Sequence, residues 1–181
     1  MKENLECIVF WFRRDLRLND NHGLYQALKS GLPVLPVFIF DKFILDSLEK
    51  DDARVSFIYQ TLSRINIQLN SLGSSLLVLY DKPIDVFEKI CNRYKVKNVF
   101  TNHDYEPYAI ERDKNIAAFL QSKNISFSTF KDQVIFEKNE VLKSDGKPYT
   151  IFTPYSRIWK AELISKPINF FPSEKLTENF I

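Results

Sequence analysis

The chain has 181 residues, of which 45% are hydrophobic and 27% charged, a composition typical of one globular domain rather than of a disordered segment. Its 25 basic and 23 acidic residues leave a net charge of +2, which is too small to predict nucleic-acid binding from electrostatics alone. No apolar run reaches the roughly 18 residues of a membrane span, and the N-terminus lacks the apolar region of a signal peptide. The well-separated Cys7 and Cys91 favour free thiols in a reducing compartment, so we expect a cytoplasmic domain.

Strand and helix patterns alternate along the first 130 residues. Short apolar runs predict five strands, over residues 7–12, 34–40, 76–80, 96–101 and 125–130. Apolar residues at helical spacing predict helices between them, around residues 22–30, 55–72, 86–94 and 106–123. Residues 41–51 are polar and predict a loop.

This alternation predicts an α/β, Rossmann-like fold with a five-stranded parallel sheet of order 3-2-1-4-5 and helices on both faces. Residues 1–133 are assigned to this core. Beyond it, a turn at 144–147 and a short helix starting at Thr153-Pro154 predict a C-terminal extension over residues 134–165. The apolar residues 166–181 are expected to be an interdomain linker; the alternative is that this tail folds back on the domain.

Charged and hydrogen-bonding residues directly follow strands 1 and 4. In an open parallel sheet, ligands bind beyond the carboxyl ends of the strands where the strand order reverses, here between strands 1 and 4. The candidate binding residues of these two loops are Phe12, Arg13, Arg14, Asp15, Asn102, Asp104 and Glu106. Guanidinium and carboxylate groups together suit a planar polar ligand. The alternative is that these charges pair with one another and only brace the loops.

Arg54 lies in the first turn of the long helix, where a cation opposes the helix dipole. Its guanidinium is therefore expected to have an anionic partner, which is either a ligand or one of Asp51 and Asp52. Phe12 and Tyr108 are candidates to pack against a ligand ring.

The remaining patterns predict binding rather than catalysis. Arg112 and Asp113 are interpreted as a local pair of neighbouring charges. The four glycines form no dinucleotide-binding or P-loop fingerprint, and two histidines are too few for a His-rich metal site. No nucleophile–base pair or carboxylate dyad stands out, so we predict no catalytic and no metal-ligating residue in this chain.

Three ordered motifs carry a family resemblance: WFRRDLRLND at 11–20, NHDYEPYAIERD at 102–113 and GKPYTIFTPYSRIW at 146–159. With them the chain resembles the N-terminal, antenna-binding α/β domain of the DNA photolyase and cryptochrome family. The resemblance implies that a helical domain absent from this chain holds the catalytic FAD. It also implies a mechanism in which an antenna pigment passes excitation energy to reduced flavin, which then splits pyrimidine dimers in DNA.

The resemblance implies that the full-length protein is a deoxyribodipyrimidine photolyase, a carbon–carbon lyase that acts on damaged DNA. The alternatives are a cryptochrome-type blue-light photoreceptor and a stand-alone nucleotide-binding module. By itself, the chain is expected to be inactive, to bind DNA weakly or not at all, and to have no membrane partner.

The expected antenna is deazaflavin or FMN, with Arg54 and Asp104 at positions that resemble ligand positions of such family members. Members that bind folate carry an Asn-Glu pair where this chain has Tyr108 and Ala109. That departure counts against methenyltetrahydrofolate.

Overall fold

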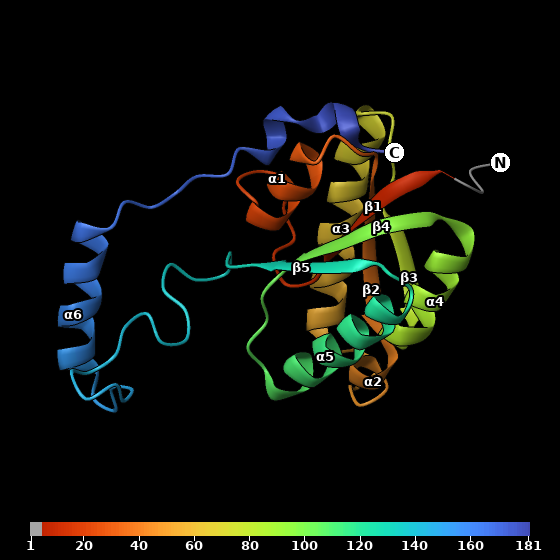
Figure 1. The fold of residues 1–181 in the computed structure, drawn as a ribbon. Coiled ribbons are helices and arrows are strands. Elements are labelled where there is room, and N and C mark those ends of the chain that lie inside the picture. The colour runs from red at the N-terminus through yellow and green to blue at the C-terminus, as the bar shows by residue number, and fades with distance from the viewer. Residues whose placement is uncertain (1–4) are drawn as a thin grey trace.

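Five parallel strands form a single sheet in the order β3-β2-β1-β4-β5 (Figure 1). The computed structural model describes residues 5–181. The strands are β1 (Glu6–Phe12), β2 (Val34–Asp41), β3 (Leu77–Asp81), β4 (Lys95–Asn102) and β5 (Ser126–Phe130). The helices are α1 (His22–Lys29), α2 (Lys42–Leu45), α3 (Ala53–Ser71), α4 (Pro83–Arg93), α5 (Pro107–Ser122) and α6 (Phe152–Ser165). The predicted fold class and strand order are confirmed.

Helices cover both faces of the sheet, and β1 is buried between them. Helices α1 and α3 pack on one face, through Leu24, Leu28, Leu62, Ile65 and Leu69. Helices α4 and α5 pack on the other, through Val86, Phe87, Ile90, Ile116 and Leu120. Side chains of a strand point alternately to its two faces, so β1 contributes Ile8 and Phe10 to the first cluster and Val9 to the second. This two-sided burial is the reason that β1 reads as a continuous apolar run.

Two local features differ from the simplest pattern. Residues 41–51, predicted as a loop, contain α2, a single helical turn. The backbone N–H of Phe43 lies in the first turn, where it has no acceptor within the helix, and it donates to the Asp41 side chain over 3.0 Å. Pro36 lies within β2, but β3 pairs with β2 only from Val37 onward. Pro36 therefore has one neighbouring strand, an edge-like position in which a sheet tolerates proline.

An extended arm, residues 131–170, leaves the end of β5, carries α6 and returns toward α1 (Figure 1). It is anchored at both ends. On the outward side, Glu137 Oε2 lies 2.8 Å from His103 Nδ1 and accepts a hydrogen bond of 2.6 Å from the Tyr105 hydroxyl. Directly after its return end, the Phe171 ring stacks on His22 with centroids 3.6 Å apart. No residue of α6 itself is buried, and the helix stands away from the sheet.

The last eleven residues pack against the domain. The Ser173 hydroxyl is buried and donates to the Leu18 carbonyl over 2.6 Å, and Phe180 belongs to the core cluster beside α1 and α3. The backbone N–H of Ile181 donates to the Val34 carbonyl over 3.1 Å. Residues 171–181 thus fold back on the domain, as the alternative for the tail has it, whereas residues 166–170 are exposed. The division into core, extension and linker stays a prediction.

Within the described part of the chain, no helix has both the length and the apolar character that crossing a membrane requires.

Candidate functional site

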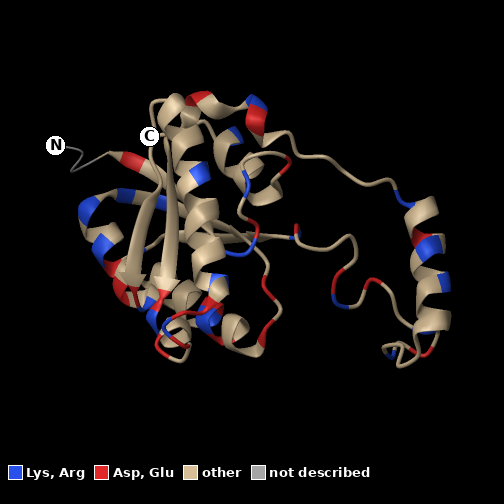
Figure 2. Cartoon of the chain, turned by 180° about the vertical axis from the view of Figure 1, so that it is seen from behind, with Lys and Arg blue, Asp and Glu red and all other residues tan. Residues whose placement is uncertain are grey.

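A cleft of about 500 Å³ opens at the carboxyl ends of β1, β2 and β4, where the strand order reverses. Its walls come from the loop after β1, the end of β2 with α2, and the first turns of α3 and α5. Seven of the nine predicted site residues line it: Phe12, Arg13, Arg14, Arg54, Asp104, Glu106 and Tyr108. Figure 2 shows acidic and basic residues interleaved in the loops at this edge of the sheet. The topology therefore brings together most of the residues that the sequence singles out.

Asp15 and Asn102, the other two predicted residues, lie in a buried hydrogen-bond network instead of in the cleft lining. The Asp15 carboxylate accepts hydrogen bonds from the side-chain amides of Asn21, over 3.0 Å, and of Asn102. Asn102 Oδ1 in turn accepts from the backbone N–H of Gly23 over 2.8 Å. This network fixes the loop after β1 to the end of β4 and to the start of α1.

The buried Asp15 carboxyl predicts an unusual pH dependence. Burial is the largest cause that raises its pKa above the ordinary value of 3.8, against the hydrogen bond from Asn102. A raised pKa in the folded state means that the contribution of Asp15 to stability is full below pH 3.8 and is lost as the pH rises through the folded-state pKa. From about pH 4 to pH 7, the free energy of unfolding of the wild type should therefore fall relative to that of Asp15→Asn. Urea denaturation of both proteins at each pH measures this difference, and a constant difference would contradict it.

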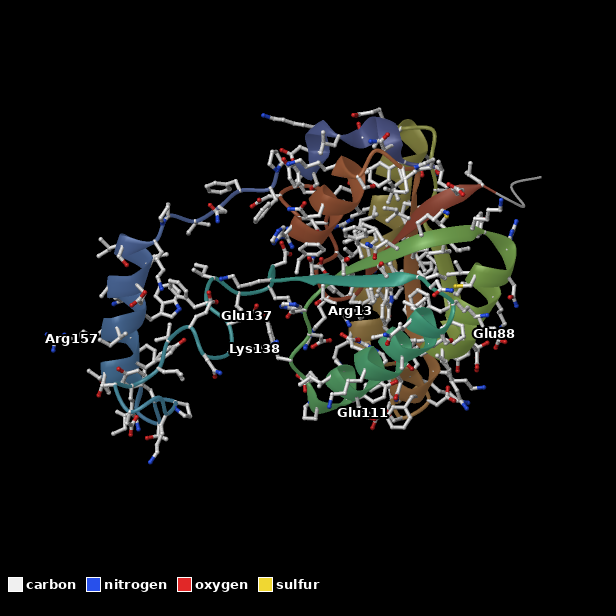
Figure 3. All side chains as sticks on the ribbon, in the orientation of Figure 1. Arg13, Glu88, Glu111, Glu137, Lys138 and Arg157 are labelled. Atoms are coloured by element: carbon white, nitrogen blue, oxygen red, sulfur yellow. The ribbon has the colours of Figure 1, made fainter. Side chains whose placement is uncertain are left out.

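Arg13 forms a buried ion pair with Asp113 of α5. Its Nη1 donates to both carboxylate oxygens over 2.7 and 2.8 Å, and its Nη2 donates to the Asn102 carbonyl. Arg13, labelled in Figure 3, lies in the interior of the domain. Only 5% of its side chain is exposed, and burial lowers its pKa although Asp113 acts in the opposite direction. Arg112 also contacts Asp113, at 3.1 Å. The predicted local pair is therefore present, but the main partner of Asp113 lies 100 residues away.

Aromatic rings form one wall of the cleft. The guanidinium groups of Arg13 and Arg112 lie 4.9 and 4.8 Å from the ring centroid of Trp11. The Tyr108 ring stacks on Phe43 of α2 with centroids 4.7 Å apart and planes 14° from parallel. Trp11 is buried, so the surface that suits a flat ligand is that of Tyr108 and Phe43, since aromatic rings stack on planar groups.

The Tyr108 hydroxyl donates to Asp41 Oδ2 over 2.6 Å. Burial, and next this hydrogen bond, raise the pKa of Tyr108, so the phenol stays neutral. Sequence reasoning missed Asp41, Phe43 and Arg112 as cleft residues. A signal for the first two was present, because an aspartate at the end of a strand followed by a short apolar turn is a typical helix cap.

The remaining charges of the cleft pair with neighbouring carboxylates. Arg14 Nη1 lies 3.3 Å from Asp104 Oδ1 and 3.4 Å from Glu106 Oε1. Arg54 pairs with Asp52 through Nε and Nη2, and this hydrogen bonding is the main cause that lowers the pKa of Asp52 to about 2. Both alternatives raised from the sequence, pairing across the loops and pairing of Arg54 with a neighbouring aspartate, are thus seen in the structure.

Comparison with known proteins identifies the family. The family model for DNA photolyase matches residues 8–173. The deoxyribodipyrimidine photo-lyase of Synechococcus sp. (strain ATCC 27144) is 32% identical over 161 residues, which cover 89% of this chain and 33% of that protein. Cryptochromes are among the further relatives.

Solved structures show the same fold. A class III photolyase from Agrobacterium tumefaciens has a TM-score of 0.77 and 25% identity, over 86% of this chain and 32% of that one. The archaeal photolyase from Sulfolobus tokodaii, crystallised with two FAD molecules, has a TM-score of 0.73 and 25% identity, over 97% of this chain and 41% of that one. The chain thus spans about a third of the length of the Synechococcus and Agrobacterium relatives. The match of the family model over residues 8–173 shows that the chain belongs to the DNA photolyase family.

Proposed function

We propose that this chain is the light-harvesting domain of a deoxyribodipyrimidine photolyase, and that its cleft binds a flavin-type ring, either deazaflavin or FMN. The observation that carries the proposal is the cleft itself. It lies where the strand order reverses and combines aromatic faces with guanidinium and carboxylate groups. When bound there, such a ring absorbs light and passes excitation energy to a second flavin.

The residues of the cleft have separate roles in this proposal. Tyr108 and the exposed Phe43 offer aromatic surface against which the ring packs. Within the described structure, Asp104 accepts hydrogen bonds from Arg14, Tyr105 and Glu106 through Oδ1 alone, so its Oδ2 is available to a ring N–H. The fixed Asp41–Tyr108 hydrogen bond holds the aromatic wall in place.

For the whole protein, we propose light-driven repair of pyrimidine dimers in DNA, with FAD held by a helical domain outside this chain. The named Synechococcus relative supports the activity, and the Sulfolobus tokodaii structure, for which a novel light-harvesting cofactor is implied, supports a second pigment. The net charge of +2 supports weak DNA binding by this chain alone. The free thiols of Cys7 and Cys91 support a cytoplasmic location.

Titration of deazaflavin, FMN and methenyltetrahydrofolate into the chain tests the cleft. Asp104→Asn replaces one acceptor by a donor, so it should weaken binding of a flavin-type ring by roughly 10- to 150-fold, the range for a charged hydrogen bond. Tyr108→Ala should also weaken binding, because the stacking face is lost. Glu88→Ala, on the exposed surface of α4, is the matched control and should bind like the wild type.

Two results would contradict the proposal. Unchanged affinity in both cleft variants would place the ligand elsewhere. Tightest binding of the folate would reject the flavin-type ring.

A further inference from the structure

A second depression, of about 490 Å³, adjoins the cleft at the start of α3. It shares Arg13, Arg14, Arg54 and Ile58 with the cleft, so the two are continuous. Leu16, Ala53 and Phe57 complete its lining. We call this depression the arginine lobe. Among the described residues, three arginines and no carboxylate line it.

A third depression, of about 550 Å³, also adjoins the cleft and has an uncharged lining. It meets the cleft at Phe40, Leu45 and Val55. Its polar lining consists of Ser56, Tyr59, Gln60 and Tyr80, which are uncharged groups. A ligand that extends from the cleft therefore meets either a cationic or a neutral surface.

Three carboxylates, those of Asp41, Asp104 and Glu106, line the cleft beside its arginines, whereas none lines the arginine lobe. A carboxylate near a phosphate costs free energy through like-charge repulsion. An anionic group on a cleft ligand would therefore be displaced toward the arginine lobe.

Two arginines of the lobe, Arg14 and Arg54, have N–H groups that are free to bind a further acceptor. The contacts of Arg14 to Asp104 and Glu106, at 3.3 and 3.4 Å, are longer than the usual 2.7–2.9 Å of a charged hydrogen bond. Arg54 uses Nε and Nη2 for Asp52, which leaves Nη1 outside that pair. Their side chains are 54% and 73% exposed and so can reorient. In addition, the buried Nε of Arg13 has no hydrogen-bond partner in the described structure.

We propose that the arginine lobe binds the phosphate of a ligand whose ring occupies the cleft, with Arg14 and Arg54 as the contacting groups. This inference rests on the proposed function and names the ligand class within it: a phosphorylated flavin of the FMN type, rather than a ring without an anionic group. The guanidinium group matches phosphate geometry and stays charged at all relevant pH values. The apolar side chains of Leu16 and Phe57 would line the stem that joins ring and phosphate.

Paired titrations of FMN and riboflavin, which differ only in the phosphate, test the lobe. An exposed ion pair contributes about 2- to 5-fold to affinity, so the two arginines together should make FMN bind about 10-fold more tightly than riboflavin. The double variant Arg14→Gln/Arg54→Gln should lower the affinity for FMN more than the affinity for riboflavin, so that the ratio of the two affinities falls from about 10 to about 1. Added salt should weaken only FMN binding, because it screens exposed charges.

The matched control is Arg64→Gln, which removes an exposed cation from the same helix α3 outside all three depressions. It should leave both affinities unchanged. Equal affinity of the wild type for FMN and riboflavin would overturn the phosphate lobe while leaving the ring site in place. An equal loss of FMN affinity in Arg64→Gln would reduce the effect to general charge and overturn the lobe as well. Binding of neither flavin would overturn both this inference and the proposed function.

Discussion

Replacing Asp113 with alanine should lower the free energy of unfolding by about 3–5 kcal/mol, the usual cost of breaking a buried ion pair from one side. The variant leaves the guanidinium of Arg13 buried, with 5% of its side chain exposed and without its bidentate acceptor. The cation of Arg112, which also contacts Asp113, then repels Arg13 without the attraction of Asp113 to offset it. Urea denaturation at neutral pH measures the loss.

Two further variants separate the ion pair from other effects of the substitution. Glu111→Ala changes the exposed neighbouring residue of α5 and should cost less than about 0.5 kcal/mol. Arg13→Met/Asp113→Leu removes both charges, so it should recover most of the stability that Asp113→Ala loses. A loss below about 1 kcal/mol in Asp113→Ala would mean that water reaches Arg13 and replaces the carboxylate.

This ion pair also explains why the cleft could be located from the sequence but not fully described. The carboxyl ends of parallel strands meet at one edge, so the loops after β1 and β4 could be placed together from the strand order alone. The pairing of Arg13 with Asp113, by contrast, depends on how α5 packs on the sheet. A single sequence offers the adjacent Arg112 as an equally good partner.

The same limit applies to the residues whose surroundings the sequence does not reveal. Asp15 and Asn102 follow the right strands, but their side chains turn into the buried network, because unpaired polar groups there would be costly. Phe43 was overlooked because its segment is polar on average, and a single-turn helix has no periodicity to detect. Periodic patterns thus predicted the elements and the sheet, whereas side-chain partners required the three-dimensional packing.

Gly23→Ala should destabilise the protein by about 3 kcal/mol, although alanine ordinarily stabilises a helix by up to about 1 kcal/mol relative to glycine. Gly23 is buried in α1, and a Cβ there would lie 2.5 Å from Asn102 Oδ1 and 3.1 Å from the Phe10 ring. Asn102 cannot easily withdraw, because its side chain donates to Asp15 and, over 2.8 Å, to Asn21. The clash therefore either breaks this network or moves α1 away from the sheet.

The contrast with Gly31→Ala decides whether the close approach, rather than the loss of a glycine, causes the effect. Gly31 has a φ of +77° and nothing within 4 Å of a Cβ position, so alanine there should cost only about 1–2 kcal/mol of backbone strain. Urea denaturation should rank Gly23→Ala as the more harmful change. The reverse order would mean that the Asn102 network shifts without cost.

If the predicted order holds, Gly23→Ala should also weaken ligand binding at the cleft, because the network of Asp15 and Asn102 positions the loop that carries Arg13 and Arg14.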